Sequence, residues 1–234
     1  MLHGMTESKL QATLRRSNEL DDGVWAALPD PYVSAVRDPR HDASLAASLM
    51  SLEHGRAIRL LISAEMITTG ISVQRIQFEA LARSMWLLYA ASADEVGAAT
   101  APMSPKAAKA GDKLPMAAEM VEALKGKAPP GAYEAMAGFK AATLKPLHSY
   151  AHAGFHPLKR HMEGYPETLV VQILWNSNAL LTMACSMFAA LAGSPAAMRA
   201  VNQVRLAFTD CLPVITPGEV QPASGSAKAS DIKA

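Results

Sequence analysis

Two groups of ionisable side chains have the types and spacing that chemistry requires, and the first lies in the N-terminal half of the chain. Arg75, Glu79 and Arg83 recur every four residues, so they share one face of a helix that is otherwise apolar. Glu53 is expected on the apolar side of the preceding helix, where a carboxylate needs a cationic partner such as Arg75 or Arg83. These groups form either a solvated ladder with one ordinary ion pair or the wall of a polar cleft.

The second group is a run of histidines. His148 and His152 are four residues apart and share a helix face. Such a pair can hold a transition metal when a carboxylate, here Glu53 or Glu79, completes the shell. His152 can instead act as an acid–base group, because imidazole titrates near neutral pH. The third interpretation is that both rings make caps and hydrogen bonds at a helix end.

The elements that must position these residues are predicted to be helices. Apolar residues recur with a helical period, and no stretch alternates in the manner of a strand. Gly70 is expected to be the turn between the second and third helices, and Pro146 to kink or restart the fifth. The predicted helices span residues 8–28, 42–69, 71–92, 115–127, 132–152, 166–192 and 195–210. This pattern predicts an all-α bundle of about six or seven helices in one domain, 1–212, followed by a disordered tail, 213–234, rich in Pro, Gly, Ser, Ala and Lys.

The predicted helix at 42–69 has one broad apolar side. Leu45, Met50, Leu52 and Leu60 fall on that side of a helical wheel, whereas the side opposite to it carries polar residues, among them Ser48, Ser51 and His54. The wheel therefore predicts that the leucines face the core and the serines face solvent.

Composition restricts the class of protein. Only 18% of the 234 residues are charged, so the chain is expected to bury an unusually apolar core or to hide apolar surface in a homo-oligomer. The net charge of +1 does not show the excess of basic residues that is typical of a general nucleic-acid binder. A local basic patch at an RNA-cutting site would not appear in this total. Polar residues within 168–193 favour a core helix over a membrane span. The polar N-terminus and only two cysteines favour the cytoplasm.

The motifs also resemble a known group of proteins. Two motifs resemble those of uncharacterised bacterial helical families of the DUF type. They are the helix Arg75-x-x-x-Glu79-x-x-x-Arg83-x-x-Trp86 and the later sequence His148-Ser-Tyr-Ala-His152-Ala-Gly. These families are reminiscent of the HEPN superfamily of helical bundles. The resemblance spans roughly residues 45–190.

The resemblance to HEPN proteins implies a dimeric, metal-independent ribonuclease in toxin–antitoxin or phage-defence systems, with RNA and a cognate antitoxin as partners. It would place the superfamily's histidine at His152 and its arginine within 145–147, where this chain has Lys-Pro-Leu. Arg83 or Arg75 would then supply the guanidinium that contacts phosphate, with Glu53 and Glu79 holding the arginines. No cofactor is expected. The rival hypotheses are a non-catalytic interaction module and a metal-binding helical bundle.

Overall fold

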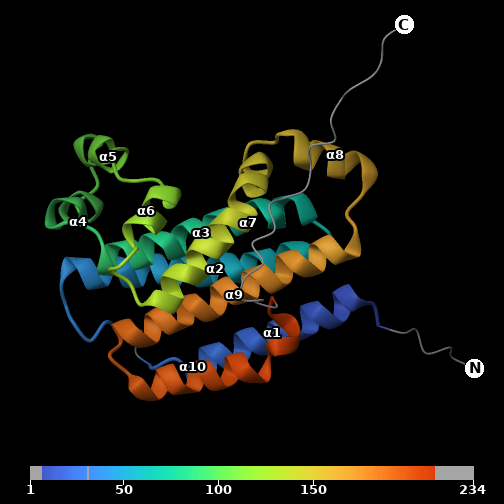
Figure 1. Cartoon of the computed structure of the whole chain (residues 1–234), viewed down its shortest axis with the longest axis horizontal. Coiled ribbons are helices and arrows are strands. Elements are labelled where there is room, and N and C mark those ends of the chain that lie inside the picture. The colour runs from blue at the N-terminus through green and yellow to red at the C-terminus, as the bar shows by residue number, and fades with distance from the viewer. Residues whose placement is uncertain (1–6, 31, 214–234) are drawn as a thin grey trace, which may run out of the picture.

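The computed structural model describes residues 7–30 and 32–213. These residues form ten α-helices and one short 3-10 helix, and no strand occurs among them (Figure 1). The helices are α1 (Lys9–Ala27), α2 (Pro39–Ser63), α3 (Ile67–Tyr89), α4 (Ala93–Ala99), α5 (Pro105–Gly111), α6 (Ala117–Ala123), α7 (Pro130–Ala151), α8 (Phe155–Glu163), α9 (Glu167–Leu191) and α10 (Pro195–Ala207), followed by η1 (Thr209–Cys211). The all-α prediction is confirmed.

The long antiparallel hairpin of α2 and α3 is the centre of the fold. Helix α9 packs along both of its helices, α7 packs on α3, and α1 and α10 lie on α9 (Figure 1). The main core lies among these helices and includes Leu52, Phe78, Leu181 and Phe188. The short helices α4 to α6 pack at one end of the hairpin, where Trp86 is buried against Met120. Helices α3 and α7 thus carry the two groups of ionisable residues side by side.

Several predicted helix ends match the structure. Ser8 caps α1 and forms the expected reciprocal pair with Gln11, which satisfies two free backbone N–H groups. Helix α2 begins three residues earlier than predicted because Asp38 caps it and Pro39 opens its first turn. The turn between α2 and α3 is not at Gly70. That residue lies buried inside α3, and Glu65, with a φ of +61°, reverses the chain instead.

The predicted orientation of α2 is confirmed for Leu45 and Leu52, which are buried, and wrong at other positions. Met50 and Leu60 are 51% and 69% exposed, whereas Ser44, Ser48 and Ser51 are fully buried. The buried hydroxyls are satisfied because Ser44 donates to the carbonyl of Ser84, Ser51 to that of Gln77 and Ser48 to that of Ala184. Small side chains with hydrogen bonds to a neighbouring backbone allow close helix packing, so they replace leucines at this seam.

Three helices account for the excess over the predicted six or seven. Residues 93–114, expected to be a loop with some helical turns, contain α4 and α5, and α8 follows directly after Gly154. Helix α7 continues through Pro146, so the predicted restart does not occur. The predicted disordered tail, 213–234, lies outside the described residues apart from Pro213. Helix α9 is long and apolar enough to cross a membrane, but 61% of its most apolar stretch is buried inside the molecule, as in a core helix.

Candidate active site between helices α3 and α7

The candidate site begins with an ion pair on α3. Arg75 Nε donates to Glu79 Oε1 over 2.8 Å, one turn along the helix, as the spacing predicts. The Arg75 side chain is only 14% exposed, and that of Glu79 is 30% exposed. The carboxylate therefore fixes the guanidinium in one orientation at the edge of the core and leaves its terminal nitrogens free to make further bonds.

One of these nitrogens reaches across to α7. Nη1 of Arg75 donates to Nδ1 of His148. A guanidinium has no acceptor, so Nδ1 must accept, and the ring proton is assigned to Nε2. In this arrangement His148 is a neutral imidazole whose remaining function is to donate through Nε2–H.

His152 completes the group at the C-terminal end of α7. Its ring centroid lies 4.5 Å from that of His148, with an angle of 58° between the planes. Neither ring nitrogen of His152 makes a hydrogen bond to any residue within 7–30 or 32–213, and the residue is exposed. His152 is therefore the imidazole of this pair whose two ring nitrogens are both open to a ligand.

Packing between α3 and α7 holds these groups in place. Ser72 donates to the carbonyl of Tyr150 over 3.1 Å, and Phe78 stacks on Phe139 with centroids 4.9 Å apart. Tyr150 is buried, and this burial raises the pKa of its phenol. The contacts run in opposite directions along the two helices, so α3 and α7 are antiparallel where they meet.

The turn after His152 is unusually tight. The Gly154 N–H donates to the carbonyl of Ser149, and the hydroxyl of Ser149 accepts from the backbone N–H of His156. A Cβ on Gly154 would lie 2.7 Å from Ser149 Oγ, so only glycine fits without displacement. This turn leads directly into α8, whose first residue, Phe155, follows His152 by three positions and packs edge-on against His156.

Two predicted site residues lie elsewhere. Glu53 is exposed on α2 and makes no salt bridge with Arg75 or Arg83 within the described part of the chain, so the predicted buried pair is wrong. Arg83 lies two turns beyond Arg75, which is about 12 Å along α3. Because α3 and α7 are antiparallel, Arg83 lies toward Phe139 and away from His152. The structure brings together only Arg75, Glu79, His148 and His152.

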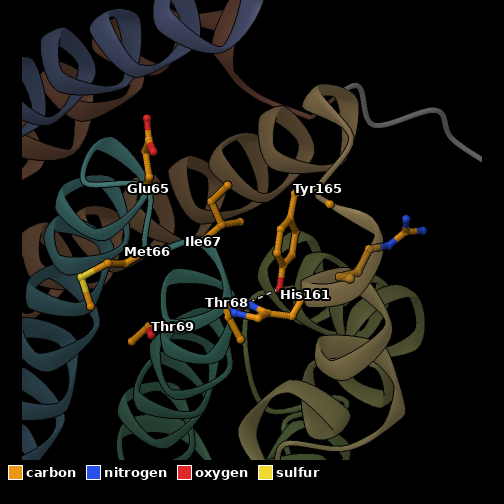
Figure 2. Close-up of a pocket in the computed structure, with 9 residues that line it drawn as sticks. Glu65, Met66, Ile67, Thr68, Thr69, His161 and Tyr165 are labelled. Carbon is orange, nitrogen blue, oxygen red and sulfur yellow. Dashed lines mark hydrogen bonds between the residues drawn. The ribbon is translucent and has the colours of Figure 1, made fainter.

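A cleft of about 430 Å³ opens near the start of α3, between that helix and the α8–α9 connection. Thr68 and the phenol of Tyr165 share a hydrogen bond of 2.6 Å, and Nδ1 of His161 lies 3.4 Å from the Thr68 hydroxyl (Figure 2). Arg160 also lines the cleft. Thr68 is about 10 Å along α3 from Arg75, so the cleft is a neighbour of the histidine pair.

A metal site would need a third ligand beside the two histidines. Within residues 7–30 and 32–213, no three His, Cys, Asp or Glu side chains gather closely enough to hold an ion. Glu79, one of the two carboxylates predicted as the third ligand, accepts from Arg75, and the other, Glu53, lies on α2. The donor set therefore suits hydrogen bonding and proton transfer.

Sequence reasoning missed the residues around this group. Phe155 is 71% exposed and stands three positions after His152, and Leu158 and Met162 continue its exposed face along α8. An aromatic residue that follows a glycine directly after the histidines was an available signal. Tyr165 could not be predicted as a neighbour of the site, because its partner Thr68 is distant in sequence.

A family model described as "Family of unknown function (DUF6988)" matches residues 48–214. The chain belongs to this family. The matched region extends from α2 to the end of the described chain, so it contains the whole α3–α7 group, whereas α1 lies outside it. No curated protein and no solved structure matches the chain. The DUF6988 family thus agrees with the expected DUF-type assignment.

Proposed function

We propose that this DUF6988 protein is a metal-independent, HEPN-like ribonuclease that acts on single-stranded RNA in bacterial toxin–antitoxin or phage-defence systems. The observation that supports the proposal is the group formed by Arg75, held by Glu79, and the adjacent rings of His148 and His152. Two imidazoles beside a guanidinium are the groups that phosphodiester transfer requires when no metal takes part.

Each side chain has a separate task in the proposed reaction. His152 removes the proton from the 2′-hydroxyl of RNA, and that oxygen forms a bond to the adjacent phosphorus. The P–O5′ bond breaks, and the leaving oxygen takes a proton from the His152 imidazolium or from water. Arg75 and the Nε2–H of His148 donate to the phosphoryl oxygens, whose negative charge increases as the bonds change. The products are a 2′,3′-cyclic phosphate and a free 5′-hydroxyl.

Helix α8 supports the choice of single-stranded RNA. An exposed aromatic ring is a platform on which an unpaired base can stack, and Phe155 offers one three positions after His152. Arg160 follows on the same helix and supplies a cation for the RNA backbone, and Lys159, which is paired with Glu163 over 2.6 Å, would have to exchange that carboxylate for a phosphate. The cleft at Thr68 and His161 has room for the next nucleotide. This local set of cations is compatible with a net charge near zero.

The rival function is a non-catalytic interaction module. The exposed apolar residues of α8, namely Phe155, Leu158 and Met162, favour it, because an apolar helix stripe of this kind also suits a protein partner. In this alternative, Arg75 and Glu79 only join α3 to α7. The two hypotheses differ in whether the protein cleaves RNA.

A cleavage assay tests the proposal. The full chain is incubated with a fluorescent single-stranded RNA and with its 2′-deoxy counterpart, both in EDTA. We expect cleavage of the RNA alone, with cyclic phosphate ends, and a loss of at least about 100-fold in His152→Ala, as is usual when a general acid–base group is removed. Arg75→Lys keeps the charge but loses the planar fork, so a smaller loss of about 10-fold or more is expected.

The matched control is His41→Gln, which removes a histidine on α2 that pairs with Asp38 away from the site. It should cleave like the wild type. Equal rates in His152→Ala and the wild type would assign the activity to a contaminant and overturn the proposal. Intact RNA in the presence of the folded wild-type protein would favour the interaction module.

A further inference from the structure

Arg160 lines the cleft at the start of α3, and its guanidinium makes no hydrogen bond or ion pair within the described part of the chain. Its side chain is neither exposed nor fully buried. Glu163, three positions along α8, pairs with Lys159 over 2.6 Å. Glu65 also lines the cleft, but Figure 2 shows its side chain directed away from His161. A partly buried cation with five N–H donors is thus available to an anionic ligand in this cleft.

The other polar groups of the cleft also have protons to donate. Thr68 and Tyr165 share one hydrogen bond of 2.6 Å, so one of their two hydroxyl protons remains for a third acceptor. Nδ1 of His161 lies 3.4 Å from the Thr68 hydroxyl, which is longer than an ordinary hydrogen bond. When this nitrogen accepts, Nε2 carries the ring proton and is a further donor. The cleft therefore presents donors from α3, from α8 and from the connection between α8 and α9.

This set of donors suits a phosphate group better than a carboxylate. A guanidinium fork alone satisfies a planar carboxylate, whereas a tetrahedral phosphate can also accept from hydroxyl and imidazole donors that lie in other directions. The cleft volume of about 430 Å³ lies within the range of small-molecule pockets, about 300–1,000 Å³. Met66 and Ile67 give the cleft an apolar wall. It therefore suits a phosphate together with the sugar that carries it.

Hydrogen bonds connect the cleft with the histidine pair. The Ser72 hydroxyl lies 2.9 Å from the carbonyl of Thr68 and 3.1 Å from that of Tyr150, which precedes His152 by two residues. Burial is the main cause that raises the pKa of the Tyr150 phenol, and the positive charge of Arg160 acts on this pKa in the opposite direction. The guanidinium is therefore close enough to α7 for its charge to act there. The cleft and the proposed active site are about 10 Å apart along α3.

We infer that the cleft is a second phosphate-binding site, in which Arg160, with donors from His161 and Tyr165, binds the RNA phosphate next to the one that is cleaved. The choice of RNA rests on the proposed function, because one strand that runs through both sites makes the ligand a polynucleotide. The inference adds that recognition extends one phosphate beyond the reacting one. A substrate that lacks this phosphate should therefore bind more weakly.

Binding of dinucleotides that cannot be cleaved tests this inference. The probe is a 2′-deoxy dinucleotide in three forms: without a terminal phosphate, with a 5′-phosphate and with a 3′-phosphate. Calorimetric titration of the full chain at one salt concentration should show that one phosphorylated form binds at least about 10-fold more tightly than the unphosphorylated form. This is the factor expected from hydrogen bonds to a charged group. Equal binding of the three forms would overturn the inference.

Two arginine variants separate the cleft from general electrostatic attraction. Arg160→Gln should abolish the gain from the terminal phosphate and leave the affinity for the unphosphorylated form unchanged. Arg199→Gln is the matched control, because it removes an exposed arginine from α10, which packs on α1 and α9. It should keep the full gain, and circular dichroism checks that both variants are folded. An equal loss in the two variants would assign the gain to net charge and refute the cleft as a site.

The binding test is independent of catalysis, because the 2′-deoxy probes lack the attacking hydroxyl. A chain that shows the gain dependent on Arg160 but cleaves no RNA retains the phosphate site and loses the proposed nuclease activity. A chain that cleaves RNA but shows no such gain retains the activity and loses this site.

Discussion

Asp21 joins a buried arginine, Arg59, and a half-exposed one, Arg56, between α1 and α2, and its replacement is the most informative test of what stabilises the bundle. Its Oδ2 accepts from Arg56 Nε over 2.8 Å and from Arg59 Nη2 over 2.9 Å, and its Oδ1 accepts from Trp25 Nε1 over 3.1 Å. Arg59 is only 4% exposed, and its Nη1 has no hydrogen-bond partner among residues 7–30 and 32–213. Burial lowers the pKa of Arg59, but a guanidinium remains charged at neutral pH.

Asp21→Asn leaves the shape of the cluster nearly unchanged and removes its only negative charge at the centre. The Arg59 guanidinium then stays buried without a counter-ion, which costs about 3–5 kcal/mol. The free energy of unfolding of a domain is about 5–15 kcal/mol in total, so this loss is a large fraction of the stability. With a urea slope of about 3 kcal/mol per M, the unfolding midpoint, followed by circular dichroism at pH 7, should fall by about 1–1.7 M.

The neighbouring Asp22 supplies the control. Asp22 is exposed, so Asp22→Asn makes the same change of charge and should alter the unfolding free energy by no more than about 0.5 kcal/mol. Adding Arg59→Met to Asp21→Asn removes the stranded charge and should recover part of the loss. If Asp21→Asn and Asp22→Asn unfold at the same urea concentration, the attribution of stability to this buried cluster is wrong.

Two further predictions concern other groups. Burial raises the pKa of the Cys185 thiol, and it raises the pKa of Cys211 to about 11, so at pH 8 about one Cys211 in a thousand is a thiolate. A disulfide reagent should therefore label both cysteines quickly in urea and slowly in buffer. Fast labelling of the folded protein would contradict this. Two hydrogen bonds from Arg16 lower the pKa of Asp210 below its ordinary 3.8, so the stability from this pair is present above that pH and is lost as the pH falls through the lower folded value. The difference in urea midpoint between wild type and Asp210→Asn should therefore shrink below pH 4, whereas a constant difference from pH 6 to 2.5 would exclude this linkage.

Local signals predicted much of the fold. The cap at Ser8, the helical period of α3 and the long apolar stretch of α9 depend on residues close in sequence. The ends of α1 and α9 were therefore predicted to within one residue, and those of α3 to within four. The orientation of α2 depends on tertiary partners. Ser48 and Ser51 read as solvent-facing because the backbone carbonyls that satisfy them belong to α9 and α3.

The candidate site was predictable in part. Arg75 and Glu79 lie on one helix face, as do His148 and His152, so each pair follows from its four-residue spacing. The contact that joins the pairs required the packing of α3 on α7, which sequence spacing does not contain. Glu53 was misplaced because the predicted core side of α2 included a strip, with Met50 and Leu60, that the structure exposes. Helix α8 was missed because Gly154 and Pro157 read as helix terminators, whereas Pro157 lies in the first turn, where its missing N–H has no cost.

The hydroxyl-to-carbonyl bonds between α2 and α3 have a consequence for association. A slide of one helix past the other by a turn would leave Ser44, Ser51 and Ser84 buried without acceptors, so the hairpin has one register. A surface that is rigid before contact loses little conformational entropy on binding. The hairpin therefore holds Arg75 and Glu79 in fixed positions before any ligand arrives, and association at the α3–α7 group should show no slow rearrangement step.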